Sequence, residues 1–337
     1  MPTLVDISPE ATAWVDRMKA AYADGSVFGR IRSAVIWTAD TGEDGELLLD
    51  VDPMALAARV NAEPYPLWDG HDPGRPQGKV LAAEVFKTPT GETFVAAAIG
   101  FYDGAQKVGF ADLGVDPLAP APHPAQLPAL PEDFGVILGA DPRDVDKAWI
   151  EALAREAPFP VHFDKQSHNS ADPAQVFIVA GVAFLGLVGG SFSHGFLGEA
   201  GKVSFTALHA WLKRLFERMA EQRQPILEIQ SNQQDCVVSF MMRGNDVHRL
   251  YKAHNGLADA AVRAAQLISR LADHGTPAVR LLYEFDVAAE LWFPAYAELA
   301  DGRLVTDNAN LIAAEQLPSQ LSLGLSLKSL EPPQPED

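Results

Sequence analysis

One uncharged stretch constrains this chain more than any other feature. No residue from Pro173 to Gly198 carries a formal charge, and Val176–Val188 is dense in large apolar side chains. A bilayer core about 30 Å thick requires roughly 20 mainly apolar helical residues, so this shorter run suits an interfacial segment or a buried core helix as well as a span. We expect a hydrophobic, glycine-rich helix within residues 174–198. Three environments stay open, because the helix can span a membrane, lie on one, or never meet one.

The next segment predicts an amphipathic helix. Within residues 201–223, apolar side chains recur at helical spacing, while the opposite face is basic. Such a helix can lie at a lipid headgroup boundary, or it can be an ordinary surface helix packed on a sheet. The candidate membrane or partner contacts are Val176, Phe177, Val182, Phe184, Leu185, Leu187, Trp211 and Phe216, with a basic face of Lys213, Arg214 and Arg218.

Charge and composition exclude some functional classes. The chain has 337 residues, 47% of them hydrophobic and 21% charged, which is enough for two domains with a real core. A formal net charge of −19 repels phosphate backbones on average, so general nucleic-acid binding is not expected. The N-terminal sequence lacks the basic-then-apolar order of a secretory signal. We therefore expect a cytoplasmic protein, either free or at the inner face of a membrane.

A proline-rich stretch, DPLAPAPHPAQLPALPED, divides the chain, since repeated prolines favour an extended spacer at residues 116–133. Residues 1–115 contain short apolar runs separated by turn sequences, which predicts a β-rich module; Ser8 is expected to cap its opening helix. Residues 134–312 predict an α/β module with a mixed or antiparallel sheet around the hydrophobic helix. The tail, 313–337, is expected to be disordered. The predicted fold class is α+β.

Several elements of the second module can be placed along the sequence. Strands are predicted for PILEIQS, CVVSFMM, VRLLYEFDV and ELWFPAYAEL. A single long helix is predicted from about Asn245 to His274, because small and apolar residues form a stripe at helical spacing.

A histidine-containing turn sequence in the first module is a candidate catalytic segment. The sequence LWDGHDPGRPQGKVLAAEVF, residues 67–86, places His71 in a His-Asp-Pro turn, followed by an Arg-Pro-x-Gly run and a predicted strand. This resembles the segment around the catalytic histidine of the prohead maturation proteases of tailed phages, over about residues 30–115. The resemblance implies that His71 is a general base acting on a serine of a later strand. No serine occurs between Ser33 and Ser167, so that nucleophile is not found.

No cofactor or metal ion is expected, because the histidines and acids match no common ligand spacing and no phosphate-binding loop is present. Our leading hypothesis is a non-enzymatic bacterial or phage-related protein. In it a sensor or interaction module, able to bind a protein partner, is joined to an effector module that engages a membrane or a second copy through residues 176–219. Two alternatives stay open: a hydrolase of the prohead protease type, active or inactive, and a soluble intracellular binding protein.

Overall fold

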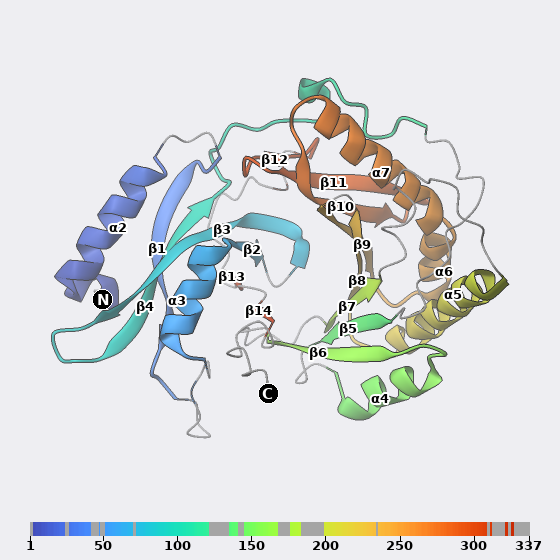
Figure 1. The fold of residues 1–337 in the computed structure, drawn as a ribbon, viewed down its shortest axis with the longest axis horizontal. Coiled ribbons are helices and arrows are strands. Elements are labelled where there is room, and N and C mark those ends of the chain that lie inside the picture. The colour runs from blue at the N-terminus through green and yellow to red at the C-terminus, as the bar shows by residue number, and fades with distance from the viewer. Residues whose placement is uncertain are drawn as a thin grey trace. The chain divides into compact units, whose positions relative to one another are not determined.

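The computed structural model describes residues 3–23, 27–41, 47, 51–69, 72–120, 135–140, 145–167, 176–182, 199–233, 235–308, 311, 321–322 and 325–326. The fold is α+β, as predicted, and the chain divides into two compact units (Figure 1). The first unit comprises Met1–Gln106, His168–Ser170 and Ala309–Asp337, and the second comprises Lys107–Ser167 and Ala171–Asn308. Residues 107–115, assigned above to the first module, thus belong to the second unit.

The first unit is an antiparallel sheet with helices on both faces. Its strand order is β1 (Arg30–Thr38), β4 (Thr93–Phe101), β3 (Asp72–Lys87), β2 (Tyr65–Asp69) and β13 (Leu321–Ser322). Helices α1 (Leu4–Ile7) and α2 (Pro9–Ala21) pack on one face, where Phe94, Ala96 and Ala98 point. Helix α3 (Pro53–Ala62) packs on the other, against Val95, Ala97 and Ile99. Because side chains alternate along a strand, β4 supplies both cores.

The two longer helices of this unit start at side-chain caps. Ser8 Oγ accepts a hydrogen bond from the amide of Ala11, with Pro9 as the first helical residue, which confirms the predicted cap of α2. Asp52 caps α3 in the same way, through the amide of Ala55 at 2.8 Å.

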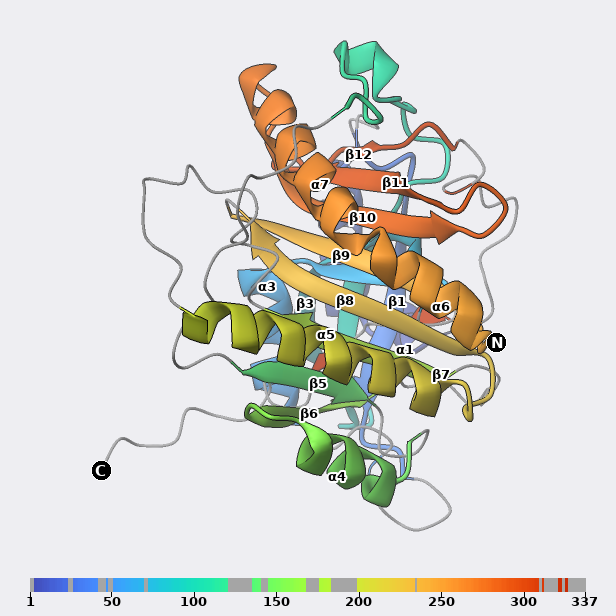
Figure 2. The same cartoon turned by 90° about the vertical axis from the view of Figure 1, so that its right-hand side faces the viewer.

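The second unit is a mixed sheet with all its longer helices on one face (Figure 2). Its strands lie in the order β12 (Leu304–Val305), β11 (Leu291–Leu299), β10 (Ala278–Asp286), β9 (Cys236–Arg243), β8 (Pro225–Gln233), β7 (Val176–Val182), β5 (Val136–Ala140) and β6 (Val161–Ser167). The parallel pairs are β5–β6, β7–β8 and β9–β10. Their crossover helices are α4 (Lys147–Glu156), α5 (Glu199–Met219), α6 (Val247–Asn255) and α7 (Leu257–Asp273), and a short 3-10 helix, η1, spans Ala111–Leu113.

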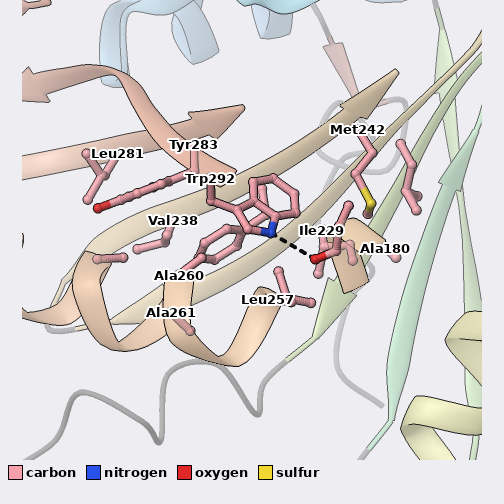
Figure 3. Close-up of a cluster of buried hydrophobic side chains, with 14 of the residues drawn as sticks. Ala180, Ile229, Val238, Met242, Leu257, Ala260, Ala261, Leu281, Tyr283 and Trp292 are labelled. Carbon is pink, nitrogen blue, oxygen red and sulfur yellow. Dashed lines mark hydrogen bonds between the residues drawn. The ribbon is translucent and has the colours of Figure 1, made fainter. Parts of the chain in front are cut away.

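Trp292 lies in the core between this sheet and its helices (Figure 3). Its indole nitrogen donates a hydrogen bond to the carbonyl oxygen of Ala253 at 2.8 Å, and its ring contacts Phe240 edge-on, with 5.5 Å between ring centroids. The predicted long helix is interrupted at this point, because Gly256 separates α6 from α7 and packs against the Trp292 ring. That prediction was wrong in treating 245–274 as one continuous helix.

The hydrophobic segment also departs from expectation, because Val176–Val182 forms strand β7 rather than part of a helix. This strand lies between β5 and β8, and Ile178 and Ala180 are fully buried against the helices. Ile178, Val179 and Ala180 are buried at successive positions of this inner strand, a pattern that periodicity alone does not separate from a buried helix. Residues 183–198, including Phe184, Leu185 and Leu187, lie outside the described residues.

Within the part of the chain that the structure describes, none of the helices combines the length and apolar character that crossing a membrane requires. In the tail, which was expected to be disordered, residues 321–322 and 325–326 form the short strands β13 and β14 (Leu325–Ser326). The other residues of 313–337 lie outside the described part.

The buried position of β7 makes a testable prediction. Replacing Ala180 with Asp places an unpaired charge in the core and is expected to cost about 3–5 kcal/mol of unfolding free energy. Ile137→Asp on the neighbouring strand β5 is the matched control, because Ile137 is 55% exposed. Urea unfolding measures both variants, and equal losses would contradict the placement of β7.

Candidate functional site

The sequence that resembles the protease turn forms the β2–β3 connection. Strand β2 ends at Asp69 and β3 begins at Asp72, while His71 itself lies outside the described residues. Asp72 is 2% exposed; its carboxylate accepts a hydrogen bond from the amide of Gly74 at 2.9 Å and lies 3.5 Å from the Arg75 guanidinium. These contacts hold the first residues of β3. The general-base role of His71, and with it the hydrolase alternative, stays a prediction.

The glycine of the Arg-Pro-x-Gly run has a packing role. Strands β3 and β4 approach so closely that a Cβ atom on Gly78 would collide with the carbonyl oxygen of Gly100. Part of the motif is therefore explained by the sheet itself and needs no catalytic function.

The outer edge of β2 receives a strand from near the end of the chain. Leu321 pairs antiparallel with Asp69, and Ser322 pairs with Trp68. The Trp68 side chain is 8% exposed, and its indole nitrogen is buried without a hydrogen-bond partner among the described residues. Sheet edges present unpaired backbone donors and acceptors, so they are the natural docking places for extended segments. This edge already holds one, contributed from about 250 residues further along the chain.

Two of the side chains proposed for membrane or partner contact are part of the second unit's core. Trp211 is 1% exposed and donates its indole hydrogen bond to the carbonyl oxygen of Leu153 at 3.1 Å; Phe216 is fully buried. Val176 is 7% exposed. These three side chains therefore stabilise the fold rather than face a lipid or a partner. The backbone of Phe177 and Val182 belongs to β7, but their side-chain surroundings are not among the described features.

The proposed basic face of α5 is joined to the neighbouring helices. Arg214 donates to the carbonyl oxygen of Glu156 at 3.2 Å, and Arg218 forms an ion pair with the Glu156 carboxylate at the end of α4. On the other side, Lys213 lies 5.9 Å from the ring centroid of Tyr251 in α6. Lys213 and Arg214 remain exposed, but the whole face contributes to contacts between helices.

Two histidines meet where α5 passes α6. The Nδ1 atom of His209 lies 2.8 Å from the Nε2 atom of His254, with the rings nearly perpendicular, and the Phe216 ring lies against His254. Burial lowers the pKa of His209, and Lys213 adds to that effect. Burial, followed by His209 and Lys213, lowers the pKa of His254 to about 4, with Asn255 opposing the shift. Both rings are therefore neutral at pH 7.

A buried polar network occupies the sheet face turned away from the helices. Glu228 is 1% exposed, and its carboxylate accepts hydrogen bonds from Ser239 at 2.5 Å and from Gln230 at 2.7 Å. Burial by itself lowers the pKa of Arg280, but Tyr296, Glu228 and Glu298 outweigh it, so the pKa is raised. The network thus keeps a charged guanidinium among carboxylates.

Sequence reasoning missed both groups. Polar residues alternate with apolar ones in ILEIQ, which indicates a polar sheet face, and this signal was present. No sequence signal indicated the histidine pair, because 45 positions separate its members and only helix packing brings them together.

Comparisons with known proteins do not assign a family. No protein-family model, curated protein or solved structure matches this chain. Among the described residues, no three His, Cys, Asp or Glu side chains cluster in a way that could hold a metal ion.

Removing one hydrogen-bond donor from the Glu228 network is expected to lower the stability of the fold. Ser239→Ala removes a hydrogen bond to a buried charge and is expected to lower the unfolding free energy by about 1.5–3 kcal/mol. Ser269→Ala is the control, since that exposed hydroxyl bonds only to the carbonyl of Ala265 within its own helix. Chemical denaturation compares the two, and a neutral Ser239→Ala would argue against a charged network.

Proposed function

We propose that this chain is an interaction protein whose first unit binds an extended segment of a partner protein by strand addition. The observation that carries the proposal is the antiparallel pairing of Leu321–Ser322 with Trp68–Asp69 at the edge of the first sheet. In this mode the main chain supplies the affinity, and alternate side chains supply the specificity. The partner segment takes the place of the chain's own β13.

Energetic considerations favour replacement. The β13 pairing involves only two residues, and a typical hydrogen bond contributes a net of about 0.5–1.5 kcal/mol. A longer strand can also pair along Tyr65–Leu67, which have no strand beyond them among the described residues. A partner of this kind therefore gains contacts that the chain's own two-residue strand does not make.

The chain's own sequence suggests what such a partner looks like. Residues 319–327 read SQLSLGLSL, in which leucine alternates with serine or glycine. This period of two suits a strand with one apolar face. We expect partner segments of the same type: extended, alternating between leucine-like and small polar residues, and without proline. The earlier idea of membrane contact through residues 176–219 is not part of this proposal, because Val176, Trp211 and Phe216 are buried.

Peptide binding tests the proposal. A fluorescent peptide LPSQLSLGLSLKSL is titrated into the full chain and into its Ser322→Pro variant, in which proline weakens the chain's own β13. Because the internal strand competes with the peptide, the variant is expected to bind it about tenfold more tightly, which corresponds to about 1.4 kcal/mol. Fluorescence anisotropy measures the affinities.

Two controls accompany this experiment. Ser329→Pro alters the tail outside the paired residues and should bind like the wild type. A peptide methylated on alternate backbone nitrogens should lose affinity, because strand addition requires those donors. The proposal fails if Ser322→Pro does not bind the peptide, or if the methylated peptide binds equally well.

A further inference from the structure

We infer that His209 and His254 form a proton-sensitive latch, which holds α5 against α6 when both rings are neutral and releases this junction in acid. This inference concerns the second unit and is independent of the strand-addition proposal. His209 Nδ1 lies 2.8 Å from His254 Nε2. At that distance one nitrogen donates and the other accepts, so the contact requires an unprotonated nitrogen.

The surroundings decide which ring donates. Nδ1 of His254 is buried and has no hydrogen-bond partner among the described residues. Leaving a buried N–H unpaired there would be costly, so the proton of His254 belongs on Nε2, which donates to Nδ1 of His209. His209, which is only partly buried, then carries its own proton on Nε2. This assignment follows from the hydrogen-bond pattern.

Adding a proton to either ring disrupts this arrangement. Protonation of His209 at Nδ1 places two N–H donors face to face. Protonation of His254 at Nδ1 creates a buried cation; a hydrogen bond with the Asn255 side chain favours it, but burial, His209 and Lys213 outweigh that contact. Lys213 on α5 repels a positive charge on either histidine.

Two acids near this junction, among the residues that the structure describes, are already paired. The Glu217 carboxylate of α5 accepts the hydroxyl hydrogen bond of Tyr251 in α6 at 2.5 Å. The next residue of α6, Lys252, forms an ion pair with Glu290 from the β10–β11 connection. Both nearby acids therefore already have partners.

The residue that precedes His254 connects the latch to the core. Ala253, immediately before His254, supplies the carbonyl oxygen that accepts the Trp292 indole hydrogen bond. Movement of this end of α6 thus alters a contact of Trp292, which is 1% exposed (Figure 3). Opening of the latch is expected to loosen α6 first and to change the environment of Trp292.

The sign of the pH effect follows from the lowered pKa of both histidines. The unfolded state takes up protons below about pH 6.5, whereas the folded state resists doing so until about pH 4 at His254. The contribution of the pair to stability is therefore complete above pH 6.5 and is lost as the pH falls toward 4.

Stability measured at two pH values tests the latch. The unfolding equilibrium constant of the wild type should increase by about tenfold more than that of His254→Gln between pH 7 and 5.3, because glutamine does not titrate. This window stays above the sequence pI of about 4.8. His248→Gln is the matched control, since His248 is an exposed residue of the same helix, and it should retain the wild-type response.

Two measurements on the wild-type chain keep the inference falsifiable if a variant does not fold. Side-chain NMR should show that His254 titrates far below pH 6.5. Amide protection factors across residues 249–255, which correct for the intrinsic pH dependence of exchange, should fall between pH 7 and 5.3, while those of α4 change little. A normal titration of His254, unchanged protection factors in α6, or equal pH responses of the wild type and His254→Gln would each overturn the latch.

Discussion

The burial of β7 between β5 and β8 is the constraint on which the second unit depends. This strand pairs antiparallel with one neighbour and parallel with the other, and the parallel pairing requires a crossover that returns the chain to the same end of the sheet. Helix α5 is part of that crossover, so its apolar stripe must cover the sheet. Trp211 and Phe216 are consequently core residues, and the basic side chains are left to join α5 to α4 and α6.

Charge is distributed in this unit according to the same layering. The helix-facing side of the sheet is apolar and holds Trp292 and Phe240, whereas the opposite side carries Glu228, Ser239 and Arg280. A buried carboxylate is tolerated there because two donors and a guanidinium compensate for its lost hydration. The two histidines avoid the free-energy cost of a buried charge in another way, because both remain neutral.

Much of the fold could be predicted from the sequence, and the failures have physical causes. The cap at Ser8 and the strands β8 to β11 follow from local patterns, and the structure confirms them. The run at Val176–Val182 was ambiguous because a short segment that is apolar at successive positions has no period. The helix break at Gly256 depends on Trp292, which is distant in sequence. Among the candidate site residues, Trp211 and Phe216 were recognised as an apolar stripe, but what covers such a stripe is decided by tertiary packing.

The position of β13 has a consequence for how the chain is made. The first sheet is built from early residues, yet one of its strands is contributed by residues 321–322. A ribosome adding about 5–20 residues per second needs roughly 10–50 s to produce the intervening stretch. During that interval the nascent first unit exposes the β2 edge without its own covering strand, so synthesis itself creates a period in which another polypeptide can bind there first.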